Sequence, residues 1–558
     1  MVGFFQKISA SFRKNILPVT LALAVFFSLA SFLFFYLDGQ RNTTYFDAQS
    51  HLNMARKIVD NLNPGLGQLG GLWLPLLHLL MVPFIWNDFM WHSGWAGACV
   101  SMPAFVLSVY FVFKTVELLF RDRTAAFLGA LVYMSSFNML LLQSMAMMEP
   151  LFNLTIIGSI YYLSRWARTD NLVDLSGGAF FVFLSTLTRY EGYAVLAASA
   201  AAVPIVTFIK NFNASHRYRI VEGKFLIFMT LASFGVLLWL AYSLVIFGDP
   251  LHWTHPNAAD VATVAETVRS GSPSEIMRGD PTDYYRHDLS KALLTFWWTA
   301  AIGNGLVVFF AGIAGFLSLL WFCGRNIRYA YLFIPAVLVS VAFPLFILVL
   351  MYLGQVSLLP PFLGFAGIFD KGNNLADEAG IRYTLAMLPL LAIFIGWLAA
   401  GGAYRKITVF LLIVFQVGAF FSGPLFLTYD LSLKWESVYG QENRSVEWFK
   451  ENYSGGLILA SALSHEAEIF QNGLAYKNYI HEGTGHYWEE SLKNPVRYAT
   501  WIIMNKSAKT DTSGIWGQDI LTNRFRNSKV LRNNFDLVYD DGKIMIYKIK
   551  ANKELLHF

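Results

Sequence analysis

The chain leaves its first apolar run and continues as YFDAQSHLNMARKIVDN, residues 45–61. Within this stretch the apolar residues recur at helical spacing, at Ala48, Leu52, Ala55 and Val59. Asp47 and His51 are four residues apart, so they share one face of the predicted helix. The stretch predicts a helix at a membrane surface that presents a carboxylate and an imidazole. A plainer interpretation makes Asp47 a helix cap and His51 an ordinary interfacial side chain.

The composition places this helix in a membrane protein. Hydrophobic residues make up 55% of the 558 residues and charged residues 14%, and the mean hydropathy is +0.46. A soluble domain typically carries about 25% charged residues. The net charge of +5 is spread over short loops, which gives no indication of a nucleic-acid partner. Cys99 and Cys323 both lie in apolar runs, which argues against a disulfide framework or a cysteine metal site.

The apolar runs predict an all-α polytopic membrane protein with about 11 transmembrane helices. The first run, from about Ile16 to Leu37, is long enough to span a bilayer and does not have the pattern of a signal peptide, so we expect it to be retained. The other candidate spans lie near residues 94–119, 125–142, 150–164, 174–188, 192–209, 225–247, 294–322, 330–353, 383–402 and 407–428.

Loop charges orient these helices. With the N-terminus in the cytoplasm, every loop predicted to lie inside is basic, as the positive-inside rule requires. The basic residues are Arg121 and Arg123; Arg165 and Arg168; Lys210, Arg217, Arg219 and Lys224; Arg325 and Arg328; and Arg405 and Lys406. The same topology puts residues 38–92, 248–293 and 354–381 outside, together with the C-terminus. We therefore expect a multi-pass protein of the plasma membrane.

The C-terminal part changes character and predicts a separate domain. We expect a transmembrane domain over residues 1–428 and a small extracytoplasmic α/β domain over 429–558. Four strands are predicted in this part, at GLILAS, YATWIIMN, FDLVYDD and KIMIYKIK. The last two are expected to form a hairpin that turns at Asp541–Gly542. HEAEIFQNG predicts a helix that ends at Gly473.

Three further segments place charged residues at the predicted outer face. Glu149 follows the third helix in QSMAMMEPLF, Arg189 and Glu191 join the fifth and sixth in STLTRYEGY, and Arg382 opens the tenth in AGIRYTLAMLPLL. The plainer interpretations are a carboxylate that suits a helix dipole, and arginines that snorkel or pair with a neighbouring carboxylate. These three segments and the first-loop helix all lie at the same predicted membrane face. Together they predict a site for a lipid-phosphate substrate, in which a carboxylate acts as general base and arginines bind the phosphate.

Two other outer segments carry histidines. GQLGGLWLPLLHLLMVPF, residues 67–84, is apolar but broken by glycine and proline, which indicates an interfacial or re-entrant element. His78 within it is more typical of packing than of chemistry, and we retain it as a candidate substrate contact. GDPLHWTH holds Asp249, His252 and His255, a weak metal pattern. We interpret it as a solvated or substrate-facing loop and predict no metal and no cofactor.

The chain resembles the GT-C membrane glycosyltransferases in the order and spacing of five motifs. These motifs are DAQSHLNMARKIVDN, GLWLPLLHLLMVPF, MEPLF, TRYEGY and IRYTLAMLPLL. The resemblance is to the protein O-mannosyltransferase and aminoarabinose-transferase branch and covers roughly residues 15–430. It implies an inverting, metal-independent enzyme that moves one sugar from a polyprenyl-phosphate carrier to an acceptor hydroxyl on the outer face.

The resemblance also implies roles for individual residues. It puts the acceptor-activating base at Asp47 and a second acidic position at Glu149, with His51, Arg189 and Arg382 as candidates to hold the donor phosphate. The chain has one acidic residue where protein mannosyltransferases have an adjacent pair, and no MIR-type insertion, which argues against a Ser/Thr-protein acceptor. It lacks a WWDYG-type motif, which argues against en bloc glycan transfer.

Two other functions fit the composition. A transporter or lipid flippase would use the same charged residues as a substrate path, but it would favour charges near the bilayer midplane rather than at helix ends. A receptor that displays the C-terminal domain would leave the first-loop motif unexplained. For the glycosyltransferase, the expected partners are a polyprenyl-phosphate sugar, membrane lipids and an acceptor that is a lipid, a glycan or a protein.

Overall fold

The computed structural model describes residues 2–254, 285–356, 378–422, 444–462, 464–506 and 519–550. The chain forms two compact units. The first holds Met1–Asn42, Ala98–Leu240 and Asp280–Ser432, and the second holds Thr43–Gly97, Ala241–Gly279 and Leu433–Phe558. The first-loop segment and the C-terminal part therefore belong to one unit. The division into domains at residue 428 stays a prediction.

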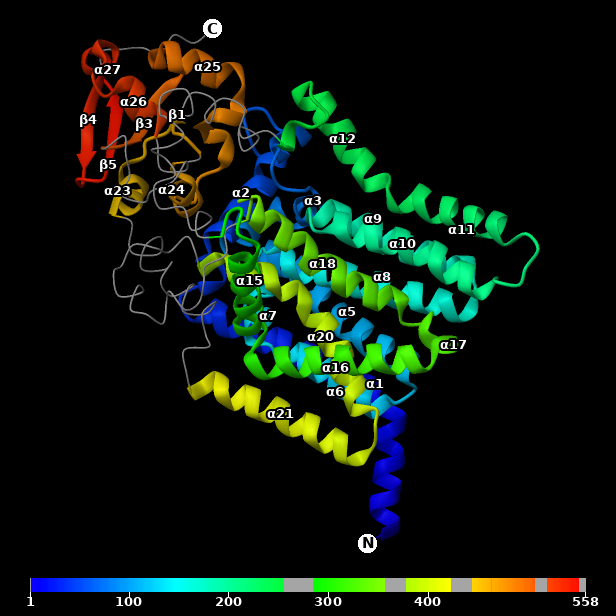
Figure 1. Ribbon diagram of the computed structural model, residues 1–558. Coiled ribbons are helices and arrows are strands. Elements are labelled where there is room, and N and C mark those ends of the chain that lie inside the picture. The colour runs from blue at the N-terminus through cyan, green and yellow to red at the C-terminus, as the bar shows by residue number, and fades with distance from the viewer. Residues whose placement is uncertain are drawn as a thin grey trace. The chain divides into compact units, whose positions relative to one another are not determined.

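In its described residues the first unit is built of helices, and several of them, such as α8, α9, α10 and α18, run in a similar direction (Figure 1). They are α1 (Val2–Leu37), α5 (Trp95–Phe120), α6 (Arg123–Met134), α7 (Phe137–Leu142), α8 (Met148–Thr169), α9 (Leu172–Thr188), α10 (Gly192–Lys210), α11 (Arg217–Ala232), α12 (Phe234–Phe247), α15 (Leu289–Asn304), α16 (Leu306–Arg325), α17 (Ile327–Ala330), α18 (Ile334–Tyr352), the 3₁₀ segment η6 (Glu378–Met387), α20 (Leu388–Ala399) and α21 (Ala403–Ser422). The boundary between the two units falls within α5 and α12.

Six helices among the described residues are long and apolar enough to cross a membrane, so the chain is a multi-pass membrane protein as predicted. They are Asn15–Leu37, Trp95–Phe120, Gly192–Lys210, Leu306–Arg325, Ile334–Tyr352 and Arg382–Ala399. The pair α11–α12, bent by 41°, raises the count to seven. Three predicted spans are divided: 125–142 into α6 and α7, 225–247 into α11 and α12, and 294–322 into α15 and α16. The expected count of 11 is therefore not confirmed.

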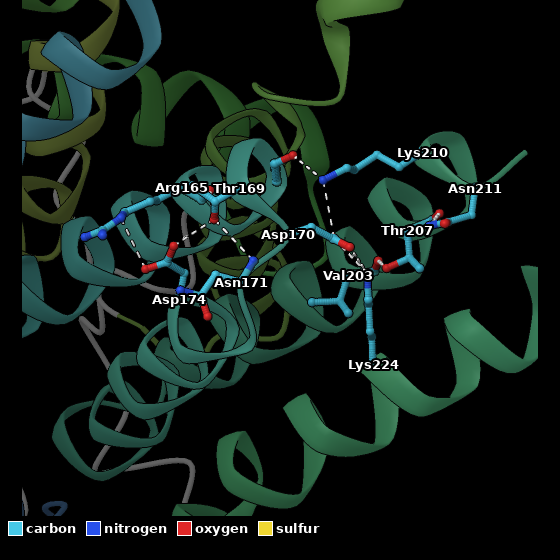
Figure 2. A network of polar contacts seen from close by, with 11 residues as sticks. Arg165, Thr169, Asp170, Asn171, Asp174, Val203, Thr207, Lys210, Asn211 and Lys224 are labelled. Atoms are coloured by element: carbon cyan, nitrogen blue, oxygen red, sulfur yellow. Dashed lines mark hydrogen bonds and ion pairs between the residues drawn. The ribbon is translucent and has the colours of Figure 1, made fainter.

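Loops that are predicted to be cytoplasmic meet at one end of the first unit. Asp170, which ends α8 in a left-handed conformation (φ 61°), accepts hydrogen bonds from Lys224 Nζ at 2.7 Å and from Lys210 Nζ at 3.3 Å (Figure 2). Lys406 Nζ lies 2.5 Å from Asp122 Oδ2, which joins the first and last of these loops. The predicted topology requires such a shared end. The compartment that this end faces stays a prediction.

The second unit combines short helices with one sheet. Its elements are α2 (Phe46–Val59), η2 (Leu66–Leu69), α3 (Leu76–Ile85), α4 (Asp88–His92), η3 (His252–Thr254), α23 (Arg444–Asn452), β1 (Leu457–Leu459), α24 (Glu466–Gln471), η8 (Tyr476–Asn478), β2 (Tyr479–Ile480), η9 (Glu482–Thr484), α25 (His486–Lys493), η10 (Pro495–Arg497), β3 (Ala499–Asn505), α26 (Ile520–Phe525), α27 (Lys529–Asn534), β4 (Phe535–Asp540) and β5 (Ile544–Ile549). The short η1 (Arg41–Thr43) lies at the boundary between the units.

The sheet contains the four predicted strands and one further strand, β2, that was not predicted. Its order is β2-β1-β3-β5-β4, with β1 parallel to β2 and β3, and with β5 antiparallel to both β3 and β4. The hairpin between β4 and β5 turns at Gly542, whose φ of 91° suits glycine. Helices α25, α26 and α27 pack on the sheet around a core that includes Leu459, Trp488, Ile502, Leu521, Phe525, Leu531 and Met545. The small α/β fold expected of the C-terminal part is therefore confirmed.

Candidate active site

A buried cluster of two arginines and two carboxylates lies where α8, α9, α10 and η6 meet. Arg189, the residue after α9, has an extended backbone that directs its side chain toward two partners. Its Nη1 donates to Glu149 Oε1 at 2.8 Å, and its Nη2 donates to Glu191 Oε1 at 2.6 Å. Nε of Arg189 lies 3.2 Å from both oxygens of Glu191. The guanidinium is thus shared by two carboxylates.

Arg382 approaches the same cluster from η6. Its Nε lies 3.8 Å from Glu149 Oε1, a longer ion pair than those of Arg189. The ring of Tyr383, its neighbour in sequence, contacts both guanidinium groups: the ring centroid is 4.9 Å from Cζ of Arg189 and 5.4 Å from Cζ of Arg382. An aromatic ring attracts a cation over its face, so Tyr383 helps to hold the two arginines side by side.

The cluster carries equal positive and negative charge and is nearly closed to solvent. Side-chain exposures are 3% for Glu149, 7% for Glu191, 10% for Arg189 and 11% for Arg382. Charges this buried need partners, and here each carboxylate faces a guanidinium. Oε2 of Glu149 is buried and has no hydrogen-bond partner among the described residues. A buried acceptor of this kind suits a hydroxyl or a water molecule as its missing donor.

Two asparagines support the segment that carries Arg382. Asn153, one turn after Glu149 on α8, donates through Nδ2 to the carbonyl of Leu385 at 3.3 Å. Asn304 at the end of α15 donates to the carbonyl of Thr384 at 3.1 Å. A 3₁₀ segment that passes into an α-helix leaves carbonyls without regular partners, and these amides satisfy two of them. Neither asparagine stands out in the sequence, although MEPLFN places Asn153 at helical spacing from Glu149.

Asp47 lies in the first turn of α2, in the second unit, and is half-buried. The N-cap of this helix is Tyr45, and it makes no side-chain capping bond. Asp47 therefore lies inside the helix rather than at its cap, so the plainer interpretation of this carboxylate as a cap is wrong. The apolar residues Ala48, Leu52 and Ala55 of α2 are fully buried, as their helical spacing predicts.

His51 and His78, the two histidines predicted as candidate substrate contacts, are both buried and contact each other. His51 Nδ1 and His78 Nε2 are 2.9 Å apart, and the His51 ring lies 4.5 Å from the ring of Trp73. Burial lowers the pKa of His78 well below its ordinary value, and the neighbouring His51 lowers it further. His78 is therefore neutral near pH 7 and fixes the orientation of His51. The preference for a packing role over a chemical one at His78 agrees with this position on α3.

Arg56 fixes α2 to the following helices. Its guanidinium contacts Asp60 at 2.8 Å and Asp88 at 2.6 Å, and donates to the carbonyls of Ile85 and Trp86 at 2.8 and 2.9 Å. Arg56 is only 5% exposed and Asp60 is largely buried with it, whereas the side chain of Asp88 is 70% exposed. Arg56 does not stand out in the sequence, because three of its partners, Ile85, Trp86 and Asp88, lie far along the chain.

The weak metal pattern of the outer loop is only partly within the described residues. His252 stacks on Phe247 with the ring centroids 4.1 Å apart, and Asp249 Oδ1 accepts from the backbone of Leu251 at 3.0 Å. His255 lies outside the described residues. Within the described part of the chain no group of three or more His, Cys, Asp or Glu side chains is arranged to hold a metal ion.

The predicted site residues thus fall into two groups. Glu149, Arg189, Glu191 and Arg382 contact one another in the first unit, which confirms that these distant segments converge. Asp47, His51 and His78 belong to the second unit. That the two groups form one site stays a prediction.

The helical unit and the C-terminal sheet together define the class, a multi-pass membrane protein with a small α/β part. The sequence matches no protein-family model and no curated protein. Among solved structures, the chain is similar to the aminoarabinose transferase ArnT of Cupriavidus metallidurans bound to undecaprenyl phosphate, with a TM-score of 0.51 and 11% identity over 98% of this chain and 99% of that one. The apo form of the same protein gives a TM-score of 0.50 over the same shares.

A third solved structure, the oligosaccharyltransferase of Archaeoglobus fulgidus with a tethered acceptor peptide, aligns with a TM-score of 0.49 and 10% identity over 97% of this chain and 76% of that one. The likeness to ArnT extends over nearly the whole of both chains, so it includes the C-terminal part as well as the helices. The chain has the GT-C fold, as its motifs predicted.

Proposed function

We propose that this protein is an inverting glycosyltransferase that moves a single sugar from a polyprenyl-phosphate donor to an acceptor hydroxyl at the outer face of the membrane. The observation that carries the proposal is the buried Arg189–Glu149–Arg382 cluster within a GT-C fold. The ArnT structure to which the chain is similar holds undecaprenyl phosphate, a lipid phosphate of the class that the proposed donor would release.

The proposed reaction is a single displacement. Asp47 takes the proton of the acceptor hydroxyl, whose oxygen attacks the anomeric carbon of the sugar. The bond from that carbon to the phosphate oxygen breaks, and polyprenyl phosphate leaves from the opposite face, which inverts the configuration. Negative charge grows on the leaving phosphate, so a guanidinium beside it stabilises the transition state.

The cluster residues have separate roles in this proposal. Arg382 faces the phosphate from η6, where its Nε lies 3.8 Å from Glu149 Oε1 and its guanidinium lies beside that of Arg189. Arg189 orients Glu149 through the 2.8 Å bond to Oε1. Oε2 of Glu149 then accepts from a sugar or acceptor hydroxyl. His51, held by His78, is a further contact on the side of Asp47.

The test is turnover of lipid-linked sugars by the purified full-length protein in liposomes. A panel of radiolabelled polyprenyl-phosphate sugars is offered with membrane extracts as the acceptor, and release of polyprenyl phosphate is measured. We expect one donor to be consumed, and Asp47→Asn to lower the rate by at least about 100-fold because the general base is lost. Asp536→Asn, at a carboxylate whose side chain is 65% exposed, is the matched control and should turn over normally.

Two results would overturn the proposal. Unchanged turnover by a folded Asp47→Asn protein would remove the base from the mechanism. Movement of the intact donor across the bilayer, with no release of polyprenyl phosphate from any donor, would instead favour the transporter or flippase.

A further inference from the structure

The C-terminal part is attached to the first-loop helix α2 at residues beside Asp47. Ser50 Oγ donates to Glu466 Oε2 at 2.6 Å, and Asn53 Nδ2 donates to the backbone carbonyl of Glu466 at 3.3 Å. Glu466 opens α24, more than 400 residues further along the chain. All these residues belong to the second unit, so the contacts lie within one compact body.

Other contacts extend this attachment along the first loop. The backbone N–H of Tyr476 donates to Asp60 Oδ2 at 2.9 Å, at the end of α2. Gln68 Nε2 donates to the carbonyl of Gly483 at 2.8 Å. These two contacts use backbone groups of the C-terminal part. Glu466 differs from them, because it brings an acidic side chain to the turn of α2 that follows Asp47.

The surroundings of Glu466 connect it to Asp47. Burial is the main reason that the pKa of Glu466 is raised; the charge of Lys57 and the bonds from Ser50 and Asn53 oppose the shift, and the charge of Asp47 adds to it. The two carboxylates are thus close enough to interact. Ser50 lies three residues after Asp47, so both project from the same side of α2 one turn apart.

The neighbouring polar groups also hold a single arrangement. Asn53, which donates to Glu466, accepts through Oδ1 from Trp91 Nε1 at 3.1 Å. The Trp91 ring meets the ring of Phe470 of α24 edge to face, with centroids 6.1 Å apart. A hydrogen-bonded chain thus runs from α4 through α2 to α24. Such a chain restrains the rotation of α2 about its own axis, which sets the direction of the Asp47 carboxylate.

We infer that Glu466 is a positioning residue for Asp47, so that the C-terminal part is a component of the active site. Glu466 holds the first turns of α2 through Ser50, and with them the proposed base. This inference rests on the proposed function for its kinetic consequence. It assigns to the C-terminal part the task of aligning the base with the acceptor.

Four variants test the inference in the full-length protein. Glu466→Ala should lower kcat about ten-fold with the KM for the donor unchanged, because the buried hydrogen bond from Ser50 is lost without loss of donor contacts. Glu466→Gln should stay within about two-fold of wild type, because the amide oxygen still accepts from Ser50. Ser50→Ala should match Glu466→Ala, and the double variant should be no slower, since one interaction is removed twice. Glu489→Ala, at an exposed residue of α25, is the control.

Hydrogen exchange over residues 46–59 separates this inference from the proposed function. We expect faster exchange there in Glu466→Ala and Ser50→Ala, and wild-type exchange in Glu466→Gln and Glu489→Ala. A wild-type protein that transfers no sugar defeats the proposed function, while the exchange still decides whether Glu466 holds α2. Wild-type kcat and exchange in Glu466→Ala, or a Glu466→Gln protein as slow as Glu466→Ala, would overturn the inference.

Discussion

Arg189 illustrates how one residue type determines the geometry of the cluster. A planar guanidinium can donate to two carboxylates in different directions, and Arg189 does so to Glu149 and Glu191. A lysine has one charged nitrogen and would favour one partner at a time. Pairing with Glu191 was one of three interpretations of the arginine in TRYEGY, beside snorkelling and contact with a phosphate, and the structure shows that the pair exists. The 2.8 Å bond from Arg189 orients Glu149, and in the proposed function Arg382 contacts the phosphate.

A second residue pair, His465 and Asp519, makes the C-terminal part sensitive to pH. His465 Nε2 lies 3.3 Å from Asp519 Oδ2, and both side chains are fully buried. Burial lowers the pKa of His465, but the hydrogen bond and charge of Asp519 outweigh it, so that this pKa is raised from 6.5. Burial raises the pKa of Asp519, and His465 with the bonds from Asn505 and Thr522 outweighs it, so that this pKa is lowered from 3.8.

The signs of these shifts predict where the pair stabilises the fold. A raised histidine pKa contributes stability below pH 6.5, which is lost as the pH rises through the raised value. A lowered aspartate pKa contributes stability above pH 3.8, which is lost as the pH falls through the lowered value. The pair therefore stabilises most between these limits. Asp519→Asn should cost about 3 kcal/mol at pH 5.5, because a buried partner is left unpaired.

The measurement is the opening free energy of β3 from hydrogen exchange in the full-length protein. In wild type it should fall from pH 5.5 to pH 8, and in Asp519→Asn this decline should be smaller. Asp536→Asn again serves as the exposed control and should follow wild type at every pH. A pH dependence that is the same in Asp519→Asn and wild type would show that this pair does not stabilise the sheet.

At the scale of elements, the break between α15 and α16 depends on Gly305. Its φ of 87° lies in a region that favours glycine, and the Gln416 side chain of α21 packs where a Cβ would project. Gln416 Oε1 accepts from the backbone of Val307 at 3.1 Å, which satisfies an N–H at the start of α16. The break is thus held by a backbone conformation and by a side chain of another helix.

Gly305→Ala should therefore destabilise the first unit more than a glycine replacement that only strains the backbone. We expect the strain itself to cost of order 1–3 kcal/mol, with about 1 kcal/mol more for the displaced Gln416 bond. Gly402→Ala is the matched control, since its φ is 131° and nothing lies within 4 Å of the added Cβ. Thermal unfolding in detergent measures the stability of both variants. An equal loss of stability in the two would show that Gln416 does not contribute to the effect of Gly305→Ala.

The helices illustrate what the sequence could predict and what it could not. Long apolar runs predicted α5, α10 and α18, because a span needs a fixed length of hydrophobic residues. The breaks at Ser135 and Gly305 lie inside runs that stay apolar on both sides, so hydropathy carries no signal for them. In the sheet, alternation and the Asp541–Gly542 turn are local signals, and they predicted the hairpin.

At the scale of the whole molecule, the membrane side assigned to each segment predicted which charged residues would lie together. Glu149, Arg189 and Arg382 were expected together because each follows or opens a helix at the same predicted face, and they do contact one another. No such rule connects Glu466 to Ser50, because their contact arises from folding of the C-terminal part onto α2. Asn153 and Asn304 act on carbonyls of η6, and a sequence pattern does not show which carbonyls lack partners.

The charges of the loops also predict the orientation of the chain in the membrane. Lys210 and Lys224 flank the loop that contains Ser215, and they meet Asp170 at the end predicted to be cytoplasmic. Positively charged loops are retained inside. In a background with Cys99→Ala and Cys323→Ala, a Ser215→Cys protein should react with a membrane-impermeant thiol reagent only after permeabilisation, and a Glu489→Cys protein should react in intact cells.

Both labelled positions are exposed, so protection reports the membrane rather than burial. The reverse pattern would place the C-terminal part, and with it Asp47 of the same unit, on the cytoplasmic side. The acceptor would then have to be a cytoplasmic molecule, and transfer at the outer face would be excluded. Labelling of both positions from outside would instead require an odd number of membrane crossings between the N-terminus and Ser215, where the predicted topology has an even number. That result would overturn the predicted topology and leave the charge cluster unchanged.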